Sequence, residues 1–164
     1  MGNPNKSGIG KKKIIMTQEE KNILIKELCM RIPYGVKCNI NGKLCKVTRV
    51  DVECQQVYLK KDDGHGGTYS IARGDVIKPY LRPLTSITEK EYETFPIPFS
   101  FDSFSTWNNT ILSKVIEGTQ ILIGIDEITE IIDWFNAHHF DYRNLIEKGL
   151  ALAAPEDMYQ DIVL

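Results

Sequence analysis

The sequence lacks the features that would identify a membrane protein. Its longest nearly uncharged apolar run, Ile121–Ile125, is far shorter than the roughly 20 residues that a membrane-spanning helix needs. No charged segment followed by an apolar one opens the chain, as a secretory signal would. We therefore expect a soluble protein of the cytoplasm that has no membrane partner.

Residues for catalysis and metal binding are also scarce. The chain has three histidines, His65, His138 and His139. His139 and Asp141 have the spacing of two ligands of a facial iron triad, but no third histidine follows them. The G-x-S-x-G motif of a nucleophilic serine is missing as well. We predict no catalytic residue, no metal site and no cofactor, and hence a protein that is not an enzyme.

The cysteines have no metal-binding or redox spacing. Cys29, Cys38, Cys45 and Cys54 are separated by nine, seven and nine residues, which matches no C-x-x-C pattern. Thiols stay free in a reducing cytoplasm. We therefore predict buried structural thiols in preference to two disulfides or a zinc site.

The charge is distributed unevenly along a chain of ordinary globular composition. The 164 residues are 42% hydrophobic and 26% charged, which is typical of one domain with an appendage. Residues 33–84 carry nine basic and five acidic side chains, whereas residues 85–164 carry four and fourteen. An acidic half of this kind attracts a basic partner and argues against a protein covered all over by nucleic acid.

The first part of the chain predicts a tail and a helix. Residues 1–13 hold four lysines and few apolar groups, which indicates a flexible basic tail. Thr17 and Glu20 have the spacing of a capping box. Pro33 forces the preceding residue out of the helical region, so we expect a helix from Gln18 to Arg31.

A change to alternating hydrophobicity after Tyr34 predicts a hairpin. Apolar residues occupy every second position up to Ile40, and Asn41-Gly42 favours a two-residue type I′ turn. This turn places Ile40 opposite Lys43, Cys38 opposite Cys45 and Val36 opposite Val47. Further strands follow at Gln56–Lys61, Thr68–Ile71 and Lys78–Leu84, and the last belongs at a sheet edge because of its prolines.

These elements predict an α+β protein built around a small SH3-like β-barrel at residues 34–84. The N-terminal helix and the barrel form a unit at residues 14–84. Residues 85–125 are an aromatic-rich connecting segment. Residues 126–164 form a helical hairpin packed on the barrel, with one helix capped by Asp126 and a second over Tyr142–Lys148.

Aromatic residues in the connecting segment are candidates for protein binding. Large rigid rings supply most of the binding energy at many interfaces, and surrounding acids steer a basic partner. The alternative is that these rings are ordinary core. The candidate protein-binding residues are Phe99, Phe101, Phe104 and Trp107.

The barrel rim is a candidate site for a small ligand or a nucleotide signal. Arginine and tyrosine side chains suit such a pocket, and the candidate residues are Tyr34, Tyr69, Arg73, Lys78, Tyr80 and Arg82. Together with Lys37, Lys46, Lys60, Lys61 and Tyr58 they also supply cations and rings for single-stranded nucleic acid. The alternative is that the lysines only decorate polar strand faces, and we rank nucleic acid below the other partners.

Three sequence strings carry a resemblance to a known group of proteins. Arg31–Lys37 reads RIPYGVK, Lys78–Leu84 reads KPYLRPL, and His138–Ala151 reads HHFDYRNLIEKGLA. Together they resemble a family of small uncharacterised proteins from phages and mobile elements of gut bacteria. This resemblance implies an accessory, counter-defence role in the cytoplasm of a bacterial host cell. We therefore expect a non-enzymatic binding module for a host or phage protein, and leave open a small ligand and a homo-oligomer.

Overall fold

The capping box at Thr17 starts the first helix, α1 (Gln18–Arg31), as predicted. In this computed structural model, which describes residues 16–96 and 125–159, the Glu20 amide donates to the Thr17 hydroxyl at 3.2 Å. The Thr17 amide donates to the Glu20 carboxylate at 2.7 Å. A 3-10 turn, η1 (Ile32–Tyr34), contains Pro33. Gly35 then adopts a φ of +75°, which favours glycine, and leads the chain into the sheet.

The predicted hairpin is confirmed in its turn and its register. β1 (Lys37–Ile40) and β2 (Lys43–Asp51) are joined by Asn41 and Gly42, which both have positive φ. Ile40 lies opposite Lys43, and Cys38 lies opposite Cys45. β3 (Gln56–Lys60), β4 (Gly66–Ser70) and β5 (Ile77–Leu81) complete the strands expected in this part of the chain.

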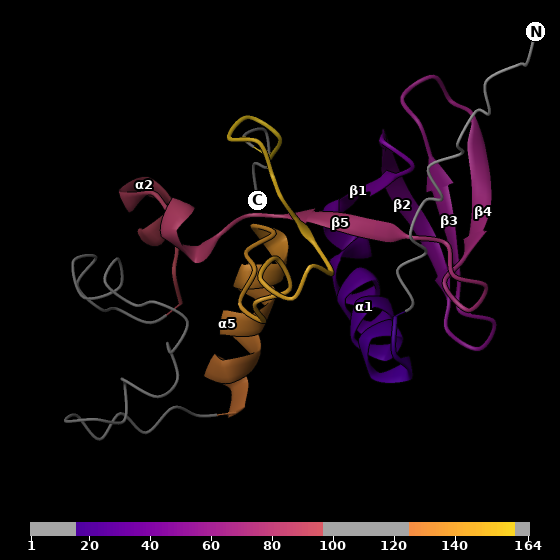
Figure 1. Cartoon of the computed structure of the whole chain (residues 1–164). Coiled ribbons are helices and arrows are strands. Elements are labelled where there is room, and N and C mark those ends of the chain that lie inside the picture. The colour runs from indigo at the N-terminus through magenta and orange to yellow at the C-terminus, as the bar shows by residue number, and fades with distance from the viewer. Residues whose placement is uncertain (1–15, 97–124, 160–164) are drawn as a thin grey trace, which may run out of the picture.

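The strands form an open sheet that does not close into a barrel, so the SH3-like barrel predicted at residues 34–84 is not confirmed. The strand order is β4-β3-β2-β1-β5-β6, with β6 (Leu152–Ala153) parallel to β5. β6 pairs with the end of β5, and α1 covers the inner face of the sheet (Figure 1). The strand predicted at a sheet edge, β5, instead lies between β1 and β6. The β6 ladder reaches only Tyr80 and Leu81, so Pro79 has no partner on that side, where its missing donor costs nothing.

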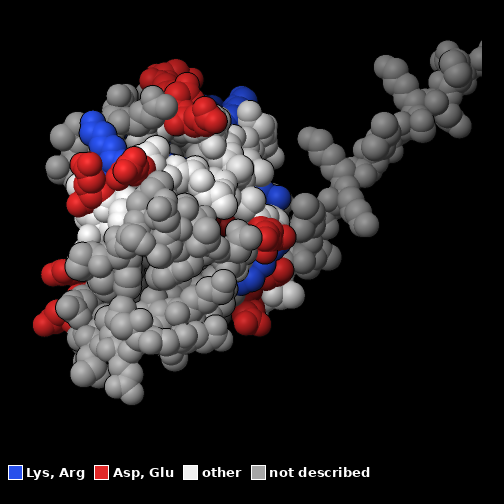
Figure 2. All heavy atoms as spheres, turned by 90° about the vertical axis from the view of Figure 1, so that its left-hand side faces the viewer, with Lys and Arg blue, Asp and Glu red and all other residues white. Residues whose placement is uncertain are grey.

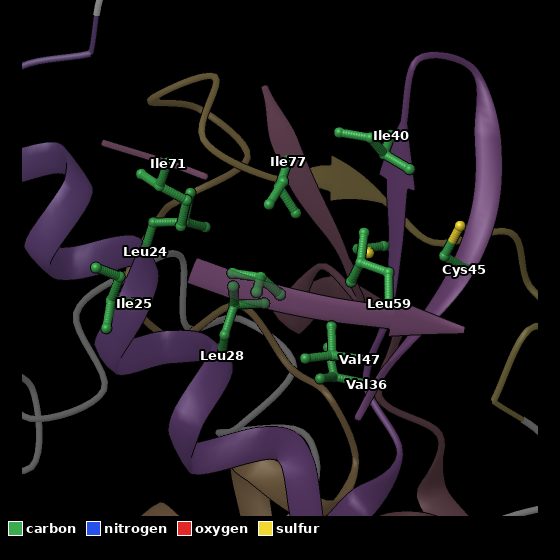
Figure 3. Packing of buried hydrophobic residues seen from close by; sticks show 12 residues of the cluster. Leu24, Ile25, Leu28, Val36, Ile40, Cys45, Val47, Leu59, Ile71 and Ile77 are labelled. Atoms are coloured by element: carbon green, nitrogen blue, oxygen red, sulfur yellow. The ribbon is translucent and has the colours of Figure 1, made fainter. Parts of the chain in front are cut away.

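One hydrophobic core lies between α1 and the inner face of the sheet. Figure 3 shows helix side chains such as Leu24 and Leu28 directed toward strand residues such as Val47 and Leu59. Cys38 and Cys45 are buried in this core as free thiols, as predicted. Cys29 is half-buried, but Cys54 is exposed, so the prediction is wrong for that thiol. Burial raises the pKa of the Cys38 thiol to about 12, so it packs as an apolar group.

The described part of the C-terminal half contains one long helix and a series of turns. After η2 (Leu84–Ser86) and the short α2 (Glu89–Tyr92), the described chain resumes at α5 (Ile125–Ala137). The predicted second helix of a hairpin, over residues 142–148, is wrong, because this segment forms turns. Asp141 binds the amides of Leu145 and Ile146 at 2.8 Å each, and Asn144 has a positive φ, so the helical pattern cannot continue.

A buried arginine at the end of α1 binds the backbone of the C-terminal half. Arg31 donates to the carbonyl oxygens of Phe135 at 3.2 Å and Phe140 at 2.8 Å. Its other donors bind the carboxylate of Glu27, one turn earlier in α1. Both side chains are fully buried. The pair therefore places the end of α5 beside the end of α1. No helix in the described ranges is long and apolar enough to cross a membrane.

Candidate functional site

Three lysines form a row across the outward face of the sheet. Because strand side chains alternate between faces, Cys38, Cys45 and Leu59 point into the core and their neighbours point outward. Lys37 on β1 lies opposite Lys46 on β2, and Lys46 lies opposite Lys60 on β3. Neighbouring strands are about 4.8 Å apart, so the row spans about 10 Å. We call Lys37, Lys46 and Lys60 the lysine row.

None of the lysines in the lysine row forms an ion pair with a described residue. Within residues 16–96 and 125–159, the ion pairs involve arginines, and none involves a lysine. Asp51, at the end of β2, is the one carboxylate in strands β1 to β5, and it accepts from the Cys54 amide at 2.9 Å. Like charges directly opposite each other destabilise a sheet. This arrangement therefore favours an anion over the row.

A flat cationic platform lies beside the lysine row. The Arg49 guanidinium lies 3.8 Å from the centroid of the Tyr58 ring. Arg49 reaches the outward face because a β-bulge interrupts the β2–β3 register between Val47 and Arg49. In an uninterrupted strand Arg49 would share the inward face of Cys45 and Val47. The bulge thus adds a planar cation to the same surface.

The other end of the outward face carries Lys78 and Tyr80 on β5. Lys78 lies opposite Asn39 on β1, and the Asn39 amide donates to the Tyr80 hydroxyl at 3.1 Å. Both residues are half-buried. The basic sheet face is therefore defined by the lysine row together with Arg49, Tyr58, Lys78 and Tyr80.

The remaining residues predicted for the rim do not gather there. Tyr69 packs against the core on the inner side, and Arg73 is exposed in the turn after β4. Tyr34 lies in η1, where its carbonyl binds the His139 ring at 3.0 Å. Arg82 forms an ion pair with Glu91 and stacks on Phe140. The predicted protein-binding residues, Phe99, Phe101, Phe104 and Trp107, lie outside the described residues.

Arg49 is the residue of the basic sheet face that the sequence patterns miss. Simple alternation along β2 assigns it to the core side together with Cys45 and Val47. The bulge leaves no glycine or proline signal in Val47-Thr48-Arg49. It is stabilised instead by the Thr48 hydroxyl, which donates to the Tyr58 carbonyl at 3.0 Å.

A cleft of about 1120 Å³ lies beyond the end of β5. Its described walls come from the segment that contains α2, from the end of α5 and from the chain after β6. The lining includes Arg82, Glu91, Trp134, His138, Pro155 and Tyr159. In the described parts of the chain, no three histidine, cysteine or carboxylate groups gather to hold a metal ion. The side chains that line the cleft instead carry hydrogen-bonding groups and aromatic rings.

An arginine and a glutamate fix one wall of the cleft. Arg82 donates to the Glu91 carboxylate and, at 3.0 Å, to the Ser86 carbonyl. Burial alone would raise the pKa of Glu91, but hydrogen bonds from Arg82 and Thr88 outweigh this effect and lower the pKa to about 2. The guanidinium also lies 4.4 Å from the centroid of the Phe140 ring. Both charges are therefore held in place and largely neutralise each other.

Tyr159 separates the cleft from the basic sheet face. Its hydroxyl donates to the Tyr80 carbonyl at 3.0 Å and accepts from the Lys37 amide at 3.1 Å. Its ring stacks on His139 with centroids 3.9 Å apart. Lys37 itself donates to the Met158 carbonyl at 3.0 Å. The chain end thus orders one end of the lysine row.

Comparisons with known proteins provide no independent assignment of either surface. The described fold supports an α+β architecture, while the resemblance to phage proteins stays a prediction. No protein-family model matches the chain, and neither a curated protein nor a solved structure is significantly similar to it.

Proposed function

We propose that the protein is a non-enzymatic binding protein that holds single-stranded nucleic acid on its basic sheet face. The observation that carries this proposal is the register of Lys37, Lys46 and Lys60, which aligns three cations on adjacent strands. A row of cations follows a phosphate backbone, and this contact needs no particular base sequence.

The stacking groups favour a single strand over a duplex. In a single strand the bases are accessible, and they stack on aromatic rings or on arginine planes. Arg49 offers such a plane, because its guanidinium is exposed and supported by the Tyr58 ring. Helix α1 packs on the inner face of the sheet, on the side opposite the lysine row, so it is not placed to enter a major groove at the row.

The acidic side of the molecule restricts binding to this one face. Figure 2 views the molecule from the side of α2, where Asp and Glu are more widespread than Lys and Arg among the described residues. A nucleic acid is repelled there and attracted to the sheet.

Fluorescence anisotropy of a labelled oligonucleotide tests the proposal. We expect the affinity for single-stranded DNA or RNA to fall steeply with salt, with a slope of about −0.7 for each phosphate contact. The double variant Lys46→Ala/Lys60→Ala should reduce the magnitude of this slope by about 1.4. Lys26→Ala, on the exposed side of α1, is the matched control. Absence of binding at low salt, or an equal loss in the control, contradicts the proposal.

Binding of a basic protein partner is a second candidate function. The acidic surface in Figure 2 favours it, because rim charges steer oppositely charged partners. This function also agrees with the accessory role that the resemblance to phage proteins implies. A partner recovered from host lysate by the wild-type protein, and lost when Phe99, Phe101 and Trp107 are replaced by alanine, would support it. A partner retained by that variant would contradict it.

A further inference from the structure

His138 presents a hydrogen-bond acceptor to the cleft beyond β5. Its Nδ1 lies 2.8 Å from the carbonyl oxygen of Trp134. A carbonyl oxygen only accepts, so Nδ1 carries the proton. Burial lowers the pKa of His138 below its usual value of 6.5, so the ring is neutral near pH 7 and Nε2 carries the lone pair. Nε2 has no hydrogen-bond partner among the described residues and is not enclosed. The fold therefore fixes one tautomer of a histidine that lines the cleft.

The acceptor is held rigidly by a stack of rings. The imidazole of His138 lies 4.2 Å from Trp134, measured between ring centroids, and Phe140 stacks on the same indole at 5.5 Å. The indole nitrogen donates to the Thr94 hydroxyl at 3.0 Å. Rings locked in this way keep the His138 lone pair in a fixed direction. Rigid groups lose little entropy when a ligand binds.

The charges of the cleft balance, in contrast to those of the basic sheet face. Arg82 is paired with Glu91, and Lys90 and Glu156 are the other charged residues of the lining. Among the described lining residues, two cations and two carboxylates balance, so they supply no excess positive charge for a phosphate. Pro83, Ala154 and Pro155 add apolar surface. The described lining therefore suits an uncharged ligand that has apolar surface and is able to donate a hydrogen bond.

We propose that this cleft binds a small uncharged heteroaromatic molecule of the nucleobase or nucleoside class, one of whose N–H groups donates to Nε2 of His138. The volume of about 1120 Å³ is sufficient for such a ligand, since small-molecule sites usually measure about 300–1000 Å³. This proposal does not depend on the nucleic-acid interface, because the two surfaces share no residue of the lysine row.

Adenosine and purine riboside are a matched pair of probes. They differ in the exocyclic amine, which supplies the N–H donors of the adenine base. Binding is followed by the fluorescence of Trp134 in a Trp107→Phe background, and by equilibrium dialysis of the wild-type protein. We expect a Kd below about 1 mM for adenosine and binding about tenfold weaker for purine riboside.

Variants at two histidines complete the test. His138→Ala should bind both probes equally weakly, whereas His65→Ala, in the exposed β3–β4 turn, should keep the preference for adenosine. Circular dichroism establishes that His138→Ala is folded. Should it unfold, the comparison of the two probes on the wild-type protein decides alone. Equal affinity of the wild-type protein for both probes, or no saturable binding by dialysis at millimolar concentration, overturns the proposal.

Discussion

Lys46 on β2 and Lys60 on β3 are register partners on the outward face of the sheet. Two ammonium groups in directly opposite positions repel each other, and Lys37 continues the same row on β1. Such a pair lowers the stability of the fold. A binding function that uses both lysines would explain why the protein tolerates this loss of stability. The effect of the lysines on stability and their effect on binding can be measured separately.

Replacing Lys60 with glutamate should stabilise the fold and weaken nucleic-acid binding. The new carboxylate faces Lys46, so the repulsion becomes an attraction worth about 0.2–1 kcal/mol. Urea unfolding measures the gain, and anisotropy measures the loss of affinity. Lys26→Glu on α1 should produce neither change. If Lys60→Glu lowers the free energy of unfolding, the lysines are not in repulsive contact.

Arg49→Lys should separate stacking from charge. Lysine keeps the positive charge but has no planar group to place between the Tyr58 ring and a base. We expect weaker binding of a single strand with an unchanged salt slope, because base stacking contributes about 1–3 kcal/mol per base. Arg49→Ala should in addition reduce the slope. Equal affinity of the lysine variant and the wild type would show that Arg49 acts only through its charge.

Some of this architecture follows from local sequence signals. Thr17 and Glu20 predict the start of α1, and Asn41-Gly42 predicts the turn that fixes the register of Lys37 against Lys46. In both places a few adjacent residues determine the backbone, so no information from distant parts of the chain is needed.

The remaining features depend on contacts between distant residues. The sheet is completed by β6, which begins more than seventy residues after the end of β5. The cleft depends on the Arg82–Glu91 ion pair and on the stacking of His138 against Trp134. Residues 142–148 resemble a helix in sequence. The amides of Leu145 and Ile146, however, donate to the Asp141 carboxylate and not to the backbone carbonyls of a preceding helical turn. Periodicity alone contains none of this information.

Arg31→Met should destabilise the protein strongly. The substitution leaves the buried carboxylate of Glu27 without its main partner and removes the donors to the carbonyls of Phe135 and Phe140. Breaking a buried ion pair in this way costs about 3–5 kcal/mol, which urea unfolding measures. The double variant Glu27→Gln/Arg31→Met should be more stable than the single one, because no buried charge remains unpaired. If Arg31→Met is as stable as the wild type, Arg31 does not stabilise the contact between α1 and the end of α5.

The stability of the fold should decrease as the pH falls below about 6.5. Burial, reinforced by the positive charge of Arg31, lowers the pKa of His139 from 6.5 to about 3. Between these values the unfolded state binds a proton that the folded state does not. Stability is therefore complete above pH 6.5 and decreases by up to about 1.4 kcal/mol for each pH unit below it.

His139→Asn tests this pH dependence. Asparagine tolerates the positive φ of position 139 and does not titrate. Urea unfolding between pH 5 and 6.5 should give a smaller slope for the variant than for the wild type. The lowered pKa of Glu91 affects stability only at more acidic pH, because that contribution is lost as the pH falls from 4.5 towards 2. Identical slopes would show that His139 is not the group responsible.

The central claim is that single-stranded nucleic acid binds across β1, β2 and β3. Nuclear magnetic resonance of the ¹⁵N-labelled protein, titrated with a short oligonucleotide, locates the contact residue by residue. The account predicts that the amide signals of Lys37, Lys46, Arg49 and Lys60 shift together and saturate with a single Kd. Shifts confined to residues 125–159, or no shift in the strands at low salt, would contradict it.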